Sequence, residues 1–195
     1  MKKEIELIIS QSKEAIENVS FLSELIEQSV LEIIKSLKKG NKILICGNGG
    51  SAAESQHFAA ELVGRFEKER LAIPCIALTT DTSNLTSISN DSSFDYVFSR
   101  QIEALGNEGD ILIVLTTSDY DEDGHSLNLK NAIIKAKEKN MKTILLGSIK
   151  SEKIGALVNI AIKVNHRNTA RIQECHLLIL HILAKLIEDS FSENN

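Results

Sequence analysis

The feature that most constrains this chain is a glycine-rich turn between an apolar run and a helical pattern. Residues 42–46 read Lys-Ile-Leu-Ile-Cys, and Gly47-Asn-Gly-Gly-Ser51 follows directly. Glycines let the backbone take positive φ and approach a ligand closely, and the first turn of a helix favours an anion. The glycine spacing matches neither the dinucleotide-binding fingerprint nor the Walker phosphate loop. We therefore expect an anion site of another kind, with Ser51 capping the helix or touching the ligand.

A basic and an acidic side chain follow on the same predicted helix. His57 and Glu61 are four residues apart, which places them on one helical face, one turn further from the anion site. The alternative is a surface pair worth a few tenths of a kcal/mol. Their apolar neighbours, such as Phe58 and Leu62, favour a cleft or an interface instead. The pair beside a phosphate-sized pocket suggests chemistry on a phosphorylated small molecule.

Length and composition indicate a globular protein of one domain. The chain has 195 residues, enough to bury a substantial core, and a net charge of −5. It has no basic stripe, so neither nucleic acid nor a membrane surface is an expected partner. The sequence lacks a run of about 18 apolar residues, and its N-terminus lacks the apolar core of a signal peptide. A cytoplasmic location is expected.

The cysteines are predicted to be reduced core residues. Cys46, Cys75 and Cys175 are odd in number, widely spaced and embedded in apolar runs. This pattern argues against disulfides and against a zinc knuckle.

The first 40 residues are expected to form two helices that take part in oligomerisation. Apolar residues recur with helical periodicity over residues 2–39, and Gly40 stops the pattern. The helices either cover the domain's own sheet or pair with another subunit. The length of the apolar face favours an oligomer.

From residue 42 onward, apolar runs alternate with helical patterns, which predicts an α/β fold with a five-stranded parallel sheet. The expected strands are residues 42–46, 73–79, 110–116, 142–147 and 160–164. The expected helices are residues 51–64, 82–89, 95–104, 126–139, 152–157 and, as a long final helix, 169–189. The whole chain is one domain in this prediction, with an α/β core over residues 41–189 and a flexible tail over residues 190–195.

The strands are apolar throughout, as in Ile111-Leu-Ile-Val-Leu115, which is typical of a sheet covered on both faces. A three-layer α/β/α arrangement is therefore expected. Ligands of such folds bind beyond the carboxyl ends of the strands. The loops at residues 47–51, 80–91 and 117–126 should then meet at one rim.

The last helix offers several polar candidates whose partners stay open. Glu174 and His181 share a stripe within about 20°, whereas Gln173 and His181 differ by about 80° around the axis. A histidine among leucines and isoleucines, as His181 is, is more often a satisfied core residue than a ligand. Helical geometry alone leaves open whether Gln173, Glu174, His176 or His181 completes a site.

The loop at residues 116–126 begins with the hydroxyls of Thr116, Thr117 and Ser118 and ends at Ser126 before a helix. These groups suit a phosphate. The acidic residues between them oppose it unless they point away. Asp119, Asp121, Asp123 and Gly124 also match half of a calcium loop, but position twelve would be Lys130, so a solvated acidic loop is preferred.

Six stretches form a specific combination: Cys46-Gly-Asn-Gly-Gly-Ser-Ala-Ala, Gln56-His-Phe-Ala-Ala-Glu-Leu-Val-Gly-Arg-Phe66, Ala77-Leu-Thr-Thr-Asp, Asn90-Asp91, Phe98-Ser-Arg-Gln and Thr169-Ala-Arg-Ile-Gln-Glu. Together they resemble the phosphoheptose isomerases, and the resemblance covers nearly the whole chain. It implies a sugar isomerase (SIS) type of fold. It also implies conversion of sedoheptulose 7-phosphate to D-glycero-D-manno-heptose 7-phosphate for bacterial surface polysaccharide, either lipopolysaccharide or capsule.

The resemblance further implies a homotetramer with sites between subunits. It implies one zinc ion per subunit, with Glu61 and His181 as the groups that move protons, and it favours Gln173 and His181 over Glu174 and His176. The implied zinc ligands are His57, Glu61, Gln173 and His181. The implied substrate-binding residues are Asn48, Gly49, Ser51, Arg65, Asp91, Thr116, Thr117, Ser118, Ser126 and Gln173.

The chain departs from the family at its phosphate loop. The family typically has Ser-Thr-Ser-Gly-Asn-Ser, whereas this chain has Thr116-Thr-Ser followed by an acidic insertion, residues 119–125, before Ser126. Altered phosphate affinity or a variant substrate is therefore expected. Two alternatives to an enzyme remain: a non-catalytic binding tetramer of the kind that associates with the bacterial replication initiator, and a sugar-phosphate sensor without turnover.

Overall fold

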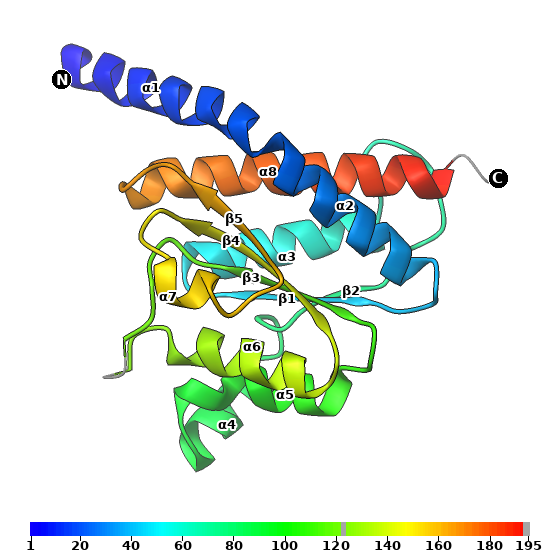
Figure 1. The fold of residues 1–195 in the computed structure, drawn as a ribbon. Coiled ribbons are helices and arrows are strands. Elements are labelled where there is room, and N and C mark those ends of the chain that lie inside the picture. The colour runs from blue at the N-terminus through cyan, green and yellow to red at the C-terminus, as the bar shows by residue number, and fades with distance from the viewer. Residues whose placement is uncertain (122–123, 193–195) are drawn as a thin grey trace.

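The computed structural model describes residues 1–121 and 124–192, in which a parallel sheet lies between two layers of helices (Figure 1). The strand order is β2-β1-β3-β4-β5, and neighbouring strands are parallel. The strands are β1 (Ile43–Gly47), β2 (Cys75–Ala77), β3 (Ile111–Leu115), β4 (Lys142–Ser148) and β5 (Ile160–Val164). The predicted α/β fold with five parallel strands is confirmed.

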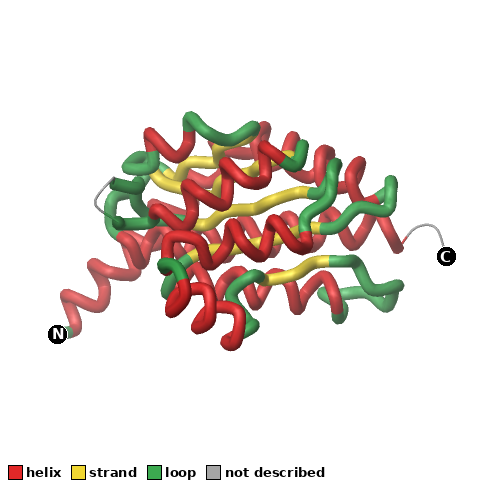
Figure 2. Tube along the Cα trace, turned by 90° about the horizontal axis from the view of Figure 1, so that it is seen from below, coloured by secondary structure: helices red, strands yellow, loops and turns green. Residues whose placement is uncertain are grey.

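Helices cover both faces of the sheet (Figures 1 and 2). One layer contains α1 (Lys2–Glu17), the 3-10 turn η1 (Asn18–Leu22), α2 (Ser23–Leu37), α3 (Gly50–Val63) and α8 (Thr169–Ser192). The other contains α4 (Thr82–Asp91), the 3-10 turn η2 (Phe94–Tyr96), α5 (Val97–Leu105), α6 (Leu127–Glu138) and α7 (Glu152–Gly155). Alternate residues of β1 show this division, since Ile43 and Ile45 face the first layer and Leu44 and Cys46 the second. The strands are therefore apolar throughout because both of their faces are buried.

The three cysteines are free thiols in the core, as predicted. Burial raises the pKa of Cys46 and Cys75 above the usual range and that of Cys175 to about 11. The thiols therefore stay protonated and act as small apolar side chains.

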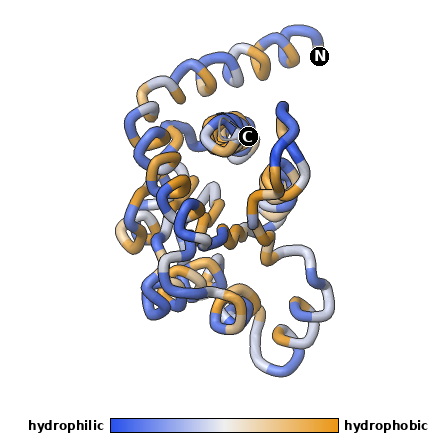
Figure 3. Tube along the Cα trace, turned by 90° about the vertical axis from the view of Figure 1, so that its right-hand side faces the viewer, coloured by the Kyte–Doolittle hydropathy of each residue, from blue (hydrophilic) through white to orange (hydrophobic). Residues whose placement is uncertain are grey.

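The N-terminal helices form a long arm that crosses α8 (Figure 1). Gly40 ends the arm with a φ of 84°, a conformation that favours glycine. Much of the apolar face of α1 stays exposed, because Ala15 is its one buried residue while Ile5 and Ile9 are 52% and 50% exposed. Hydrophobic and hydrophilic segments accordingly alternate along the arm in Figure 3.

Most element boundaries differ from those expected by one to three residues, and two of these differences have a clear physical reason. Strand β2 begins at Cys75 and not at residue 73, because Pro74 has no N–H for the ladder. Helix α8 continues to Ser192, three residues past the expected end, and Ile187 and Glu188 near that end are buried. Residues 193–195 of the expected tail, and Glu122 and Asp123 of the acidic loop, lie outside the described residues. Within the described chain, none of the helices is long and apolar enough to cross a membrane.

His176 of α8 is a neutral histidine in the core. Its side chain is fully buried, and Nε2 lies 2.9 Å from the carbonyl oxygen of Gly147. Burial lowers the pKa of His176 from 6.5 to about 4, against the opposing effect of the bond to Gly147. Between these pH values the unfolded chain binds the proton more readily, so the contribution of His176 to stability falls as the pH falls.

Replacing His176 with glutamine should remove this pH dependence while keeping an N–H donor for Gly147. The free energy of unfolding of the wild type, relative to that of His176→Gln, should fall by about 2 kcal/mol between pH 7.5 and pH 5. Urea unfolding of both proteins at one protein concentration measures the difference. A difference that does not change with pH would contradict a neutral, buried His176.

Candidate functional site

The glycine turn after β1 brings the backbone close to Ser51 at the start of α3 and to Gln173 of α8. Gly49 has a φ of 56°, which glycine adopts at low cost, and Ser51 N–H donates to the carbonyl of Asn48 at 3.0 Å. A Cβ atom at Gly47 would lie 2.7 Å from Cβ of Ser51, and one at Gly50 would lie 2.3 Å from Nε2 of Gln173. The turn therefore needs glycine for close approach as much as for backbone conformation.

Helices α3 and α8 run side by side in the same direction. Gly50 at the start of α3 lies against Gln173, and His57, seven residues later, lies against His181, eight residues after Gln173. Beyond the end of α3, the N–H groups of Phe66, Glu67 and Lys68 donate to the carboxylate of Glu188 at 2.8 to 3.0 Å. This parallel pairing fixes which residues of the two helices can meet.

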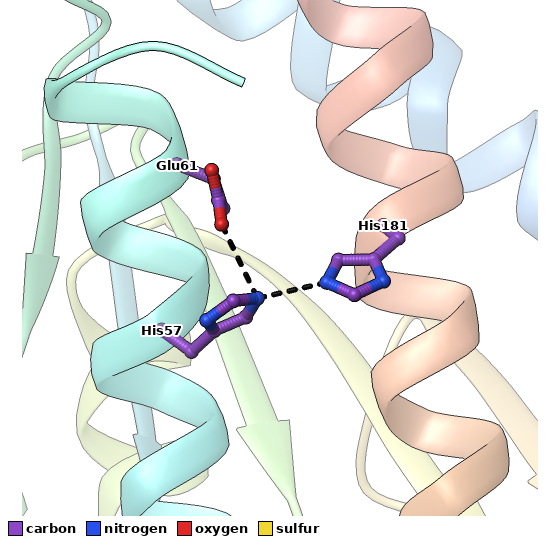
Figure 4. Close-up of side chains that lie close together, drawn as sticks. All are labelled: His57, Glu61 and His181. Atoms are coloured by element: carbon purple, nitrogen blue, oxygen red, sulfur yellow. Dashed lines mark hydrogen bonds and ion pairs between the residues drawn. The ribbon is translucent and has the colours of Figure 1, made fainter. Parts of the chain in front are cut away.

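Three of the predicted metal ligands converge between these helices (Figure 4). Nε2 of His57 lies 2.8 Å from Nε2 of His181 and 3.3 Å from Oε1 of Glu61. The ring of Phe66 packs on His181 with centroids 5.6 Å apart. His181 is therefore half-buried in a polar cluster and is not the satisfied core residue that its apolar neighbours in sequence suggest.

The chemistry and spacing of this cluster fit a divalent cation. One ligand atom from each of His57, Glu61 and His181 lies within 4.8 Å of the others. Ligand bonds of about 2.1 Å in a tetrahedral zinc site put neighbouring donors about 3.4 Å apart. The 3.3 Å between His57 and Glu61 is close to this value, whereas the 2.8 Å between His57 and His181 is that of a hydrogen bond and would lengthen around an ion. Two imidazole nitrogens that face each other, beside a carboxylate oxygen, form a typical donor set for such an ion.

A cavity of about 270 Å³ opens at the rim of the sheet, between the loops that follow β1 and β3. These neighbouring strands flank the point where the strand order reverses, which is where ligands bind in folds of this kind. The lining residues are Asn48, Gly49, Gly50, Ser51, Leu115, Thr116, Thr117, Ser118, His125, Ser126, Leu129, Thr169 and Gln173. Eight of the predicted substrate-binding residues are thus in one place, and two of the three predicted rim loops form it.

Two acidic side chains of this loop bind backbone N–H groups. The carboxylate of Asp119 accepts from the backbone N–H groups of Lys153 and Ile154 at 2.7 and 2.9 Å, at the start of α7. Asp121 accepts from the N–H of His125 at 2.9 Å. The carboxylates of Asp119 and Asp121 therefore brace the loop, and neither residue lines the cavity.

Two polar residues, one lining the cavity and one bonded to the lining residue Ser51, were missed in the sequence. His125 lines the cavity, and Glu54 of α3 has a carboxylate oxygen that is buried without a hydrogen-bond partner. Burial raises the pKa of Glu54 to about 7, and a side-chain hydrogen bond with Ser51 opposes the shift. The helical spacing of Ser51, Glu54 and His57 was a signal for Glu54. His125 is the last residue of the insertion, which the family pattern does not cover, so the resemblance gave no signal for it.

Two of the predicted site residues, Arg65 and Asp91, lie outside both the cavity and the cluster in this chain, and a third, Gln173, lines the cavity but lies away from the cluster. Arg65 is exposed and pairs with Glu69 at 2.7 Å. Asp91 ends α4 and accepts from the side chain of Asn90 at 2.9 Å. Gln173 has its amide beside Gly50, about 12 Å along α8 from His181. The roles predicted for these three residues stay predictions.

The alternatives on α8 have structural partners. Glu174 binds Arg171 and accepts from Ser12 of α1 at 2.8 Å, and His176 faces Gly147 in the core. Neither contributes to the cluster, which agrees with the preference for His181. Of the half-matching calcium loop, Asp123 lies outside the described residues, while Asp119 is bound to the start of α7.

Comparison with known proteins places the chain in a family. The model of the SIS domain matches residues 9–148. Phosphoheptose isomerase 1 of Campylobacter jejuni is 54% identical over 159 residues, which are 82% of this chain and 83% of that protein. Phosphoheptose isomerase of Helicobacter pylori strain P12 is 47% identical over 184 residues, or 94% and 93% of the two chains. The solved structure of phosphoheptose isomerase GmhA from Neisseria gonorrhoeae superposes with a TM-score of 0.88 at 39% identity, over 96% and 98% of the two chains.

The fold and the site thus define a protein of the SIS-domain class, with a sugar-phosphate-sized cavity beside a possible metal cluster. Within this class, the chain belongs to the phosphoheptose isomerase family. The resemblance drawn from its motifs is therefore confirmed.

A methyl group at Gly50 tests the contact between the two helices. The Cβ of Gly50→Ala would displace the amide of Gln173, the flexible end of a side chain, so the protein should fold but bind inorganic phosphate about tenfold more weakly. Gly155→Ala is the control, because the nearest atoms to its Cβ are 3.7 to 3.8 Å away and it lies outside the cavity. Calorimetric titration of the three proteins measures the affinity. Wild-type affinity in Gly50→Ala would contradict this arrangement.

Proposed function

We propose that the protein interconverts sedoheptulose 7-phosphate and D-glycero-D-manno-heptose 7-phosphate. The observation that carries the proposal is the spacing of the cavity and the cluster along α3. Ser51 of the cavity and His57 of the cluster are six residues apart, a rise of about 9 Å. An extended seven-carbon chain spans about 9 to 10 Å from C1 to the phosphorus, at about 1.2 Å per bond. A sugar of this length places its phosphate in the cavity while C1 and C2 reach the cluster.

The reaction needs protons moved at neighbouring atoms of the open-chain sugar. The Glu61 carboxylate takes a proton from C1 while the His181 imidazole gives one to the oxygen on C2, which yields an enediol. Glu61 then returns a proton to C2, and His181 accepts the proton of the C1 hydroxyl, which leaves an aldehyde at C1. Oε1 of Glu61 faces His57, which leaves Oε2 for the substrate.

The cluster supports the proposal that each subunit binds one zinc ion. His57, Glu61 and His181 would supply three ligands, and catalytic zinc sites commonly have three protein ligands and one open position. An ion held by these residues would supply Lewis-acid stabilisation of negative charge on the sugar oxygens. Gln173 remains a predicted ligand, although its amide beside Gly50 suits the substrate-binding role also expected of it.

The names of the relatives support this proposal over the non-catalytic alternatives. The compared proteins are phosphoheptose isomerases, and the His57, Glu61 and His181 side chains meet in this chain. A binding tetramer or a sensor would not need groups that can move protons at one point. Supply of heptose for lipopolysaccharide or capsule, from the cytoplasm, follows from the proposed activity and is part of the proposal.

Neutral substitutions of the two proton-moving residues test the mechanism. Glu61→Gln and His181→Gln should each lower kcat for sedoheptulose 7-phosphate by a factor on the order of 10² to 10⁴, because each removes a group that transfers protons. Glu138→Gln, an exposed change on α6, is the matched control. A chelator should also lower the activity, and readdition of zinc should restore it. Full activity of both variants would rule out this mechanism.

A homotetramer is the proposed assembly, because α1 and α8 expose several large apolar side chains. A groove of about 330 Å³ runs between the N-terminal arm and α8, and one of its lining residues, Ile182, directly follows His181 in the sequence. Its apolar lining residues are Ile16, Val19, Ile26, Leu178, Ile182 and Leu186. Together with exposed Ile5 and Ile9, this surface suits helices of other copies and would place subunit contacts next to the cluster.

Charged residues on this surface should dissociate the assembly. Light scattering should give the wild type a mass four times the 21.5 kDa of one chain, and Ile5→Glu with Ile9→Glu should give a smaller species. Ile134→Glu on α6, in the opposite layer, is the control and should remain tetrameric. A monomeric wild type would contradict the proposed assembly.

A further inference from the structure

The cavity that we assign to the phosphate has neither lysine nor arginine among its lining residues. Its lining includes hydroxyls, side-chain amides and the glycine turn. Charge-assisted hydrogen bonds are the strong ones for a phosphate, and a cationic partner usually supplies them. Among the lining residues, His125 is the one ionisable side chain.

His125 is held with its ring at the cavity. Nε2 lies 2.9 Å from Oγ of Ser118, which also lines the cavity. On the backbone, the N–H of His125 donates to Asp121 at 2.9 Å, and its carbonyl accepts from the N–H of Asp121 at 3.1 Å. The ring is exposed, so a ligand in the cavity can reach it.

The neighbouring backbone also carries strain at this point. Ser126 has a φ of 56°, a left-handed conformation that non-glycine residues seldom adopt. Ser126 lines the cavity beside His125 and precedes the first turn of α6. The insertion thus ends in a turn that directs two consecutive polar side chains to the cavity.

We propose that His125 is a direct ligand of the substrate phosphate and sets the phosphate affinity of this protein, a role that rests on the proposed function. In this chain the imidazole supplies a hydrogen-bond donor to the phosphate at the place where the shorter loop of the family has its glycine and asparagine. It donates a hydrogen bond, and in its protonated form a charge, to a phosphate oxygen that also contacts Ser118. The phosphate group is recognised in this way whether it belongs to the sugar or is free in solution.

Substitutions at His125 test the proposal with two readouts. His125→Ala should raise KM for sedoheptulose 7-phosphate about tenfold with kcat within about twofold, and it should raise the Kd for inorganic phosphate in parallel. His125→Gln keeps an N–H donor and should lie between the wild type and His125→Ala. His166→Gln removes an imidazole that lies outside the cavity lining and is the control, with constants like those of the wild type.

A second variant separates direct contact from support of Ser118. In a Ser118→Ala background, His125→Ala should weaken phosphate binding further if the imidazole touches the phosphate. No further loss would show that His125 acts only through Ser118 and would overturn the proposal, as would a wild-type phosphate Kd in His125→Ala with an unchanged circular dichroism spectrum. If the wild type binds phosphate but does not convert the heptose phosphate, the proposed function fails while the phosphate Kd values still decide the role of His125.

Discussion

The site depends on the packing of α3 along α8 in the same direction. Three contacts fix the register: Gly50 against Gln173, His57 against His181, and Glu188 against the backbone beyond α3. Gly50 can lie against Gln173 because glycine has no side chain. Glu188 holds the backbone beyond α3 because its carboxylate accepts hydrogen bonds from three N–H groups. A shift of one residue along α8 would turn His181 by about 100° and separate it from His57. The core beneath both helices therefore holds the register that the chemistry needs.

The same packing separates the two ends of the site by a fixed distance. The proposed anion end is the cavity between the loops that follow β1 and β3, and the proposed proton-transfer end is the cluster about two turns along α3. In the proposed function, the length of α3 between the two ends therefore selects the length of the substrate. The loop between β3 and α6 contributes residues to the cavity but none to the cluster. An acidic insertion in this loop therefore leaves the cluster of His57, Glu61 and His181 in place. Asp119 and Asp121 stabilise the loop, and neither lines the cavity.

Much of the fold could be predicted because each signal was local. The apolar strands, the glycine turn and the i,i+4 pair of His57 and Glu61 depend on neighbours in sequence. The meeting of His57 with His181 could not be predicted from spacing, since it depends on how two distant helices pack. The family resemblance supplied it. Two further features depend on the path of an insertion that the family pattern does not cover. They are the hydrogen bonds from the start of α7 to Asp119 and the position of the His125 side chain at the cavity. The end of α8 was placed too early because Phe191, which lies beyond the expected end, packs against the core.

A crystal structure with sedoheptulose 7-phosphate bound to the Glu61→Gln variant would test the central claim most directly, that one cavity and one cluster hold the two ends of the same sugar. The account predicts phosphate density in contact with Ser118 and Ser126, and C1 and C2 within about 3 to 4 Å of residue 61 and His181. Density for the phosphate elsewhere, or a sugar whose C1 and C2 point away from the cluster, would contradict it.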